Sequence, residues 1–132
     1  MEMTVTFPGG LRVNGEFNGF TVPTDQPVKG GGEGSAPSPF ALFLASLGTC
    51  AGFYVVNFCR ARNLSPEGIR VTQRTIADPE THMVSTIEIR IHVPPSFPEK
   101  YHAALVRAAE QCTVKKHLEK PPVIETMTVV EA

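Results

Sequence analysis

Apolar and polar residues alternate along the start of the chain, a pattern typical of antiparallel strands. Every second side chain from residue 1 to residue 7 is apolar, which predicts a half-buried strand. A second strand is expected to begin at Leu11 and a third at Phe20. The Asn18-Gly19 dipeptide before the third strand favours a tight hairpin turn, because both residues tolerate positive φ.

A loop rich in Gly, Pro and Ser, from Asp25 to Pro39, leads into the most apolar segment of the chain. We predict a helix from Ser38 to Asn63, with Ser38 as N-cap and Pro39 at the first helical position. No charged residue occurs from Gly34 to Cys59, so the segment is long enough to span a bilayer. Its polar residues, glycines and prolines favour instead a helix buried in a domain or a subunit interface.

Two strands and a turn are predicted in the middle of the chain. Apolar residues alternate weakly after Gly68 and clearly from Ile87 to Val93, and each alternation indicates a strand. The Asp78-Pro79-Glu80 sequence between them favours a turn. Pro94-Pro95 ends the second of these strands.

The last third of the chain is predicted to contain two helices and a strand. Ser96 and Glu99 have the spacing of a capping box, which predicts that a helix opens there. A short helix from Val114 to Glu119 and a strand around Val123 to Val130 follow. Strands and helices grouped in this order indicate an α+β fold, and 132 residues suffice for a single domain spanning 1–132.

The composition narrows the classes of protein. The chain is 42% apolar and 19% charged, which excludes a disordered tail, a collagen-like repeat and a coiled coil. Its net charge of −1 argues against nucleic acid as a partner, since phosphate binding needs a clustered positive surface. Without a visible secretory signal, and with three cysteines only, we expect a cytoplasmic protein with no membrane partner.

The cysteines are the main candidates for chemistry. Cys50 and Cys59 are nine residues apart on one predicted helix, so they lie on opposite faces about 13 Å apart and cannot form a disulfide. Cys50 and Cys112 lie on different predicted helices that packing can bring together. Cys112 stands near a helix start and before the basic run 115–117, and both features stabilise a thiolate. The alternative is that these cysteines pack as small buried hydrophobes, as we expect for Cys59.

No metal or cofactor is expected from the sequence. Cys112 and His117 lack the paired spacings of a zinc site. The glycine-rich Gly30–Gly34 stretch lacks the Lys-Ser/Thr of a phosphate-binding loop.

Two cysteine-containing stretches resemble known motifs. The stretch from Gly32 to Cys50, ending in Leu-Gly-Thr-Cys, is similar to a Gly-Pro-Ser-Pro-type loop and helix that ends in Leu-Gly-Ala-Cys. Cys112-Thr-Val-Lys-Lys-His-Leu118 is similar to a motif of Cys-Pro-Val, basic residues and a leucine. Both motifs belong to the OsmC-like family of osmotically inducible and organic hydroperoxide resistance proteins, and the resemblance extends over essentially the whole chain.

The resemblance implies a fold and an activity. The fold would be α+β, with antiparallel sheets around a long buried central helix in an intertwined homodimer. The activity would be cofactor-free reduction of a small organic hydroperoxide, with Cys50 as the peroxidatic thiol and Cys112 as the resolving thiol. An external dithiol would reduce the resulting disulfide.

The chain departs from the family pattern at several charged positions. Phe40-Ala41 stands where the family commonly has a glutamate, which leaves Glu33 as the acid nearest to the helix start. The arginine that the family takes from its N-terminal sheet is assigned to Arg12, with Lys29 as the fallback. Thr113 stands in place of the proline after the second cysteine.

A second class of function stays open, a non-catalytic OsmC-fold protein that binds a small apolar ligand at the dimer interface. The lost glutamate favours this binding protein, whereas the retained pair of cysteines favours the enzyme. Apolar side chains near Cys50 would suit an organic hydroperoxide (Phe40, Phe43, Leu47, Phe53 and Tyr54).

One chain is too small to cover the apolar helix on every side, so an obligate homodimer is expected. Gly48 and Gly52, four residues apart, would allow two such helices to approach each other closely.

Overall fold

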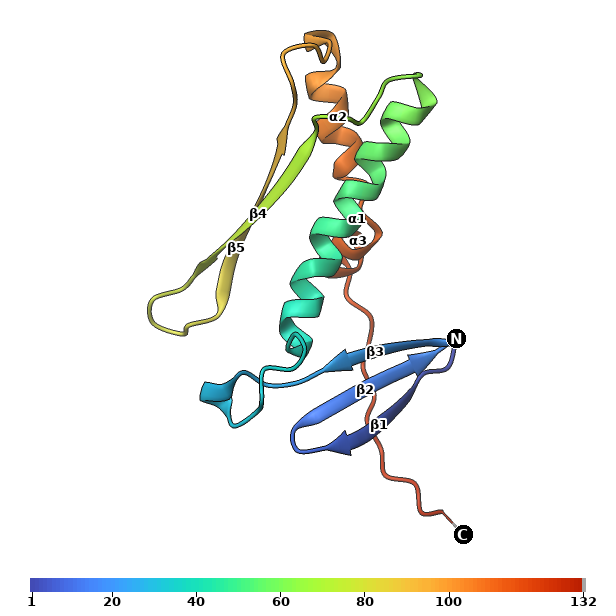
Figure 1. Ribbon diagram of the computed structural model, residues 1–132, viewed down its shortest axis with the longest axis vertical. Helices are drawn as coiled ribbons and strands as arrows, with labels where there is room; N and C mark the ends of the chain where they lie inside the picture. Colours follow the sequence, from blue (N-terminus) through green and yellow to red (C-terminus); the bar gives the residue numbers. More distant parts are fainter. Residues whose placement is uncertain (132) are drawn as a thin grey trace. The chain divides into compact units, whose positions relative to one another are not determined.

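The computed structural model describes residues 1–131. The chain divides into two compact units, Met1–Ser46 and Leu47–Ala132. The first unit contains a three-stranded sheet and the start of the long helix α1, and the second contains the rest of α1, a two-stranded sheet and the shorter helices (Figure 1). The chain is therefore a mixed α/β protein with antiparallel sheets.

The sheet of the first unit is antiparallel, with strands in the order β1-β2-β3. The strands are β1 (Thr4–Gly9), β2 (Arg12–Phe17) and β3 (Phe20–Thr24). The Asn18-Gly19 turn joins β2 to β3 with φ angles of 47° and 81°. The predicted hairpin is therefore confirmed.

The apolar side chains of β1 are exposed, although the alternation predicted a half-buried strand. Phe7 is 80% exposed, and Val5 is also exposed. Met1 and Met3 precede β1, which begins at Thr4. Alternation determines which side chains share a face of a sheet, but burial of that face needs a second layer. The first unit contains a single sheet, without a second sheet layer to cover that face.

A buried aspartate organises the loop between β3 and α1. The carboxylate of Asp25, 1% exposed, accepts hydrogen bonds of 2.6 to 3.3 Å from the Gln26, Glu33 and Ser35 amides and the Ser35 hydroxyl. These bonds, the Ser35 hydroxyl first, outweigh the cost of burial and lower the pKa of Asp25 to about 2. A Cβ at Gly32 would collide with the carbonyl oxygen of Gln26, so the loop requires glycine there.

Helix α1 spans Pro39–Ala61, close to the predicted bounds, and follows a short 3₁₀ turn, η1 (Val28–Gly30). The predicted cap is confirmed, because the Ser38 hydroxyl accepts a hydrogen bond from the Ala41 amide at 3.2 Å. One face of α1 is buried (Leu47, Ala51, Val55, Phe58 and Cys59). The other face is open, and Phe53 there is 60% exposed.

Strands β4 (Arg70–Ala77) and β5 (Val84–His92) form the antiparallel sheet of the second unit. The predicted turn lies between them, where the Asp78 amide donates to the Met83 carbonyl at 2.7 Å. Ile89 and Ile91 pack against the buried face of α1. The alternation from Ile87 to Val93 therefore correctly predicted which side chains face the core.

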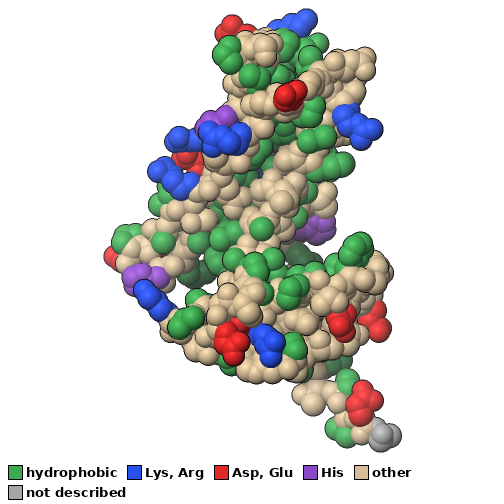
Figure 2. Space-filling view, viewed as in Figure 1, with side chains coloured by type: hydrophobic (Ala, Val, Ile, Leu, Met, Phe, Trp, Pro, Cys, Tyr) green, Lys and Arg blue, Asp and Glu red, His purple; other side chains and the backbone are tan. Residues whose placement is uncertain are grey.

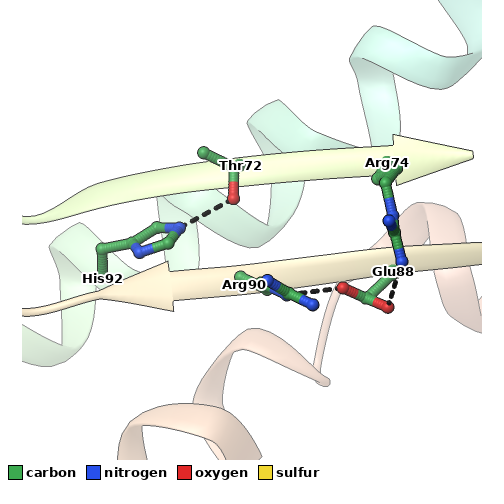
Figure 3. A network of polar contacts seen from close by, with 5 residues as sticks. All are labelled: Thr72, Arg74, Glu88, Arg90 and His92. Carbon is green, nitrogen blue, oxygen red and sulfur yellow. Dashed lines mark hydrogen bonds and ion pairs between the residues drawn. The ribbon is translucent and has the colours of Figure 1, made fainter.

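Polar side chains on β4 and β5 contact one another, both between the two strands and along β5 (Figure 3). The Glu88 carboxylate lies 2.5 Å from Nε of Arg90 and 3.4 Å from Nη2 of Arg74. Thr72 Oγ1 lies 2.8 Å from Nε2 of His92. Exposed pairs of this kind contribute little to stability, about 0–1 kcal/mol each, so the core contacts hold this sheet in place.

The predicted capping box does not form. The helical segment begins with the 3₁₀ turn η2 (Glu99–Tyr101) and continues as α2 (His102–Ala109). Pro98 precedes η2 in an extended conformation with ψ of 123°, and the Phe97 amide donates to the Pro94 carbonyl instead. Ser96 therefore lies in a separate turn and cannot cap the helix. Leu105 and Ala109 of α2 complete the core.

Helix α3 (Thr113–Glu119) matches the predicted short helix, but the predicted last strand is absent. Residues 121–131 have no strand partner within the described part of the chain. Ile124 is 85% exposed. The residue types of this segment favour extended backbone, but a strand also needs a free edge to pair with.

Apolar side chains reach the surface of the molecule in many places, as Figure 2 shows for one face. The large exposed ones lie mainly in the N-terminal strands, on α1 and in the C-terminal segment. Extensive exposed apolar surface of this kind marks an interaction site.

Asp25→Asn is expected to lower the free energy of unfolding at neutral pH, because an amide cannot replace a carboxylate that accepts four hydrogen bonds. The folded-state pKa of about 2 lies below the usual 3.8, so the stabilisation is complete above about pH 4 and is lost as the pH falls towards 2. Urea denaturation should show that the difference in unfolding free energy between wild type and variant becomes smaller as the pH falls from about 4 to 2. Glu16→Gln, at an exposed position of β2, is the control. A difference that stays constant with pH would contradict this role for the carboxylate.

Candidate redox site

Cys112 caps helix α3 and attaches its start to α1. The Cys112 sulfur accepts a hydrogen bond from the Lys115 amide at 3.4 Å, the bond of a helix N-cap. Its thiol donates to the carbonyl oxygen of Leu47 on α1 at 3.9 Å. Cys112 is only 2% exposed. Both bonds hold the Cys112 sulfur at the junction of the two helices.

Cys50 is half-buried on α1 and lies beside the same helix start. Its sulfur accepts hydrogen bonds from the Val114 amide, the Cys112 thiol and the Thr113 amide. Burial raises the pKa of Cys50, but these three hydrogen bonds outweigh it and hold the pKa below its usual value. The structure thus brings together the two cysteines that the sequence placed on different helices.

The two neighbouring thiols have opposite shifts. Burial raises the pKa of Cys112, and the nearby Cys50 raises it further, against the opposing effect of the Lys115 amide. Cys50 is therefore the first of the two to become a thiolate, while Cys112 stays protonated. The one S–H of Cys112 can donate either to the Leu47 carbonyl oxygen or to the Cys50 sulfur, but not to both at once. A thiolate beside a thiol is suited to nucleophilic redox chemistry.

The basic run 115–117 was expected to favour a thiolate at Cys112, but the pKa of Cys112 is raised, and backbone amides of the same helix start lower the pKa of Cys50 instead. Lys115 Nζ lies 3.5 Å from the Glu110 carboxylate, and His117 Nδ1 lies 2.7 Å from the Thr113 carbonyl oxygen. Within residues 47–131, Cys112 is the only ionisable side chain that contributes to the pKa of Cys50. Lys116 and His117 lie in the last turn of α3, and of the run 115–117 only the Lys115 amide contributes to the pKa of either thiol.

An apolar pocket of about 390 Å³ reaches the Cys112 side of the pair. Its walls are mostly apolar side chains of α1, β5 and the two short helices, and its polar lining residues are Cys112, Glu110 and Lys115. Of the apolar side chains expected around Cys50, Leu47 lines this pocket. The pocket is large enough for a small organic molecule.

Cys59 is fully buried, as predicted, in the core of the second unit. Burial raises the pKa of its thiol despite the positive charge of Arg62. No group of three or more His, Cys, Asp or Glu side chains in residues 1–131 is arranged to hold a metal ion.

Arg12 and Glu33 lie in the first unit, and the two cysteines lie in the second. Arg12 is exposed in β2, and its Nε donates to the Gly9 carbonyl at 3.2 Å. Glu33 has an exposed side chain and donates its amide to Asp25. A role of either residue towards Cys50 stays a prediction.

Sequence reasoning named the helix start after Cys112 but expected it to stabilise a thiolate at Cys112, not at Cys50. The Thr113 and Val114 amides contact Cys50, yet only their position directly after Cys112 could have indicated this. The role of Gly48 and Gly52 in a dimer stays a prediction, and in one chain a Cβ at Gly48 would lie 2.8 Å from Oε1 of Gln73 on β4. Gly48 therefore faces its own chain, whereas Gly52 faces open space.

These features define a mixed α/β protein whose helices bring two thiols together. A family profile described as OsmC-like protein matches residues 32–127, which include both cysteines. The chain belongs to the OsmC-like family.

Solved structures support the fold over most of the chain. A candidate osmotic-stress-induced and detoxification-response protein from Psychrobacter arcticus has a TM-score of 0.73 and 25% identity, covering 86% of this chain and 85% of that one. The organic hydroperoxide resistance protein OsmC from Legionella pneumophila has a TM-score of 0.54 and 21% identity, covering 89% of each. A candidate organic hydroperoxide resistance protein from Vibrio cholerae, with captopril in one active site, has a TM-score of 0.62 and 18% identity, covering 92% and 86%. A sequence comparison with curated proteins gives no significant match.

Cys50 is expected to react with iodoacetamide at lower pH than Cys112, because hydrogen bonds favour its thiolate while burial disfavours that of Cys112. The protein is alkylated at increasing pH, and mass spectrometry of its peptides shows which cysteine reacts first. In urea-unfolded protein the three cysteines should react alike. Faster alkylation of Cys112 in the folded protein would contradict the asymmetry.

Proposed function

We propose that this protein is a cofactor-free thiol peroxidase that reduces small organic hydroperoxides, with Cys50 as the peroxidatic thiol and Cys112 as the resolving thiol. The observation that carries the proposal is the convergence of the Cys112 thiol and two backbone amides on the Cys50 sulfur. Membership of the OsmC-like family supports it. So does the likeness to structures named as organic hydroperoxide resistance proteins.

In the first step the Cys50 thiolate attacks the terminal oxygen of the hydroperoxide. The O–O bond breaks, Cys50 becomes a sulfenic acid, and the alkoxide takes up one proton and leaves as an alcohol. Two electrons pass from sulfur to the peroxide. The amides that hold the thiolate are fixed in the backbone and need no reorganisation during this step.

In the second step the Cys112 sulfur attacks the sulfenic sulfur of Cys50. The S–S bond forms, and the hydroxyl group leaves as water with the proton of Cys112. The negative charge of Cys50, which raises the pKa of Cys112, no longer exists after oxidation. Oxidation of Cys50 therefore makes Cys112 easier to deprotonate, and the resolving thiol becomes reactive when it is needed.

An external dithiol completes the cycle by returning two electrons to the disulfide. The thiol with the lower pKa is the better leaving group, which favours attack on Cys112 with release of the Cys50 thiolate. The second thiol of the reductant then displaces Cys112 and forms the reductant's own disulfide. The apolar pocket beside Cys112 gives the reductant a path to that sulfur.

We also propose that the protein is a cytoplasmic homodimer in which a second copy covers the open face of α1. By length and composition α1 could cross a membrane. The face of α1 opposite to the open one, however, packs in the core of the second unit. In the dimer, Arg12 and Glu33 of one copy would supply charged groups to the Cys50 site of the other. The whole chain of 132 residues would then act as one functional domain.

A non-catalytic binding protein is the second candidate function. The observation that favours it is the pocket of about 390 Å³, whose lining is mainly apolar and holds one ion pair, Glu110 with Lys115. A small apolar ligand could bind there without turnover.

Cys50→Ser is expected to abolish consumption of cumene hydroperoxide, because a hydroxyl is not ionised at neutral pH. Cys112→Ser should trap Cys50 as a sulfenic or over-oxidised acid, detected by mass spectrometry. Cys59→Ala, in the core, should leave the rate nearly unchanged. Equal losses in the Cys50 and Cys59 variants, or no consumption by the wild type, would favour the binding protein.

Sedimentation at micromolar concentration is expected to give about 28 kDa, twice the chain mass of 14.3 kDa. Dilution should not release a folded monomer, because the exposed apolar surface needs a partner. A stable and peroxide-active species of 14.3 kDa would contradict the dimer.

Mixing inactive variants tests whether the two copies share a site. Arg12→Ala and Cys50→Ser chains, refolded together in equal amounts, should regain about a quarter of wild-type activity. The reason is that half of the dimers are mixed and each mixed dimer has one intact site. Refolding each variant alone is the control.

A further inference from the structure

Tyr54 and Thr113 make a contact beside the redox pair that the proposed reaction steps do not use. Their hydroxyl oxygens lie 3.3 Å apart. Tyr54 is four residues after Cys50 and so lies on the same side of α1, about one turn further along. Thr113 is the first residue of α3 and follows Cys112 directly. The pair of hydroxyls thus joins the same two elements as the pair of thiols.

We propose that Tyr54 and Thr113 are positioning residues for the Cys50 thiolate: their hydroxyl contact holds the start of α3, and with it the Thr113 and Val114 amides, against α1. This inference rests on the proposed role of Cys50 as the reacting thiol. Thr113 reaches the Cys50 sulfur only through its backbone amide, and Tyr54 acts through Thr113.

Helix α3 needs this attachment because little else holds it. It has seven residues, none of them buried, and a helix of that length is not stable by itself. The bond from Cys112 to the Leu47 carbonyl is a long sulfur contact of 3.9 Å. Such a long contact restrains the direction of the first α3 amides only weakly. The Tyr54–Thr113 bond adds a second point of attachment and restricts that variation.

The phenol of Tyr54 is itself held in place. Its ring packs edge-on against the ring of Phe53, with 5.1 Å between the centroids and 79° between the planes. Tyr54 is half-buried, whereas Thr113 is exposed. The tyrosine is therefore the more restrained of the two partners.

Thr113 has a second role through its backbone, because its amide is one of the donors to Cys50. A proline at this position would fit the first turn of a helix but has no N–H to donate. Side-chain and backbone contributions of Thr113 can thus be removed separately. Among the ionisable side chains of residues 47–131, only the Cys112 thiol affects the pKa of Cys50.

The test is the pH profile of Cys50 alkylation in reduced protein, which needs no peroxide turnover. Tyr54→Phe and Thr113→Val each remove one hydroxyl and keep the shape of the side chain. Each is expected to move the midpoint to higher pH and to slow alkylation at neutral pH about two- to tenfold, the effect of one hydrogen bond. The double variant should be no slower than the slower single variant, because both remove the same bond.

Tyr101→Phe is the matched control, since Tyr101 is the other tyrosine of the chain and its ring packs on Phe58 instead. Its pH profile should equal that of the wild type. Thr113→Pro should move the midpoint further than Thr113→Val, because the amide donor is lost as well.

Unchanged profiles for both Tyr54→Phe and Thr113→Val would overturn the proposal. A loss of stability in urea without a shift of the profile would also overturn it, because that result describes a purely structural contact. Shifted profiles in a protein that does not consume peroxide would support the positioning role and refute the peroxidase function. The two inferences can therefore fail independently.

Discussion

The attachment of the start of α3 to the middle of α1 is the contact on which the candidate chemistry depends. Cys112 makes it by two bonds at once, as the N-cap of one helix and as a donor to the backbone of the other. The same contact places two amides on Cys50. The residue that caps α3 is thereby also the thiol next to Cys50, so the helix start and the pair of thiols are built from the same residue.

The pKa values of the two neighbouring thiols shift in opposite directions because the two sulfurs make different contacts with the start of α3. Cys50 accepts from the first amides and from its neighbour, and these bonds exceed the cost of its partial burial. Cys112 is more deeply buried and lies beside the charge that Cys50 develops. The charge of Cys50 therefore affects the ionisation of Cys112, which would give the proposed reaction steps their order.

The proposed second copy of the chain would affect both the exposed apolar surface and the redox site. Apolar side chains of the N-terminal strands, of α1 and of the C-terminal segment are exposed in one chain. Arg12 and Glu33 lie in a different compact unit from the cysteines. A second copy that covers the apolar surface would also bring charged groups to a site in which backbone amides already supply part of the stabilisation.

The sequence by itself determined the features that depend on neighbours a few residues apart. The Asn18-Gly19 hairpin, the Ser38 cap of α1, the alternation of β5 and the short helix after Cys112 follow from local backbone preference and periodicity. The predicted cap at Ser96 failed for a reason that is also local, since the extended Pro98 interrupts the helix start.

Only the tertiary structure decided what each element meets. It left the apolar residues of β1 and of the C-terminal segment exposed, because burial and strand pairing need a second layer or a free edge. It directed the amides at the start of α3 to Cys50, although the sequence suggested Cys112 as the thiol that they stabilise, because the direction of α3 and not its composition determines which atoms reach the sulfur. Composition and periodicity specify a helix and its faces, whereas contact between residues 50 and 112 depends on packing across the whole second unit.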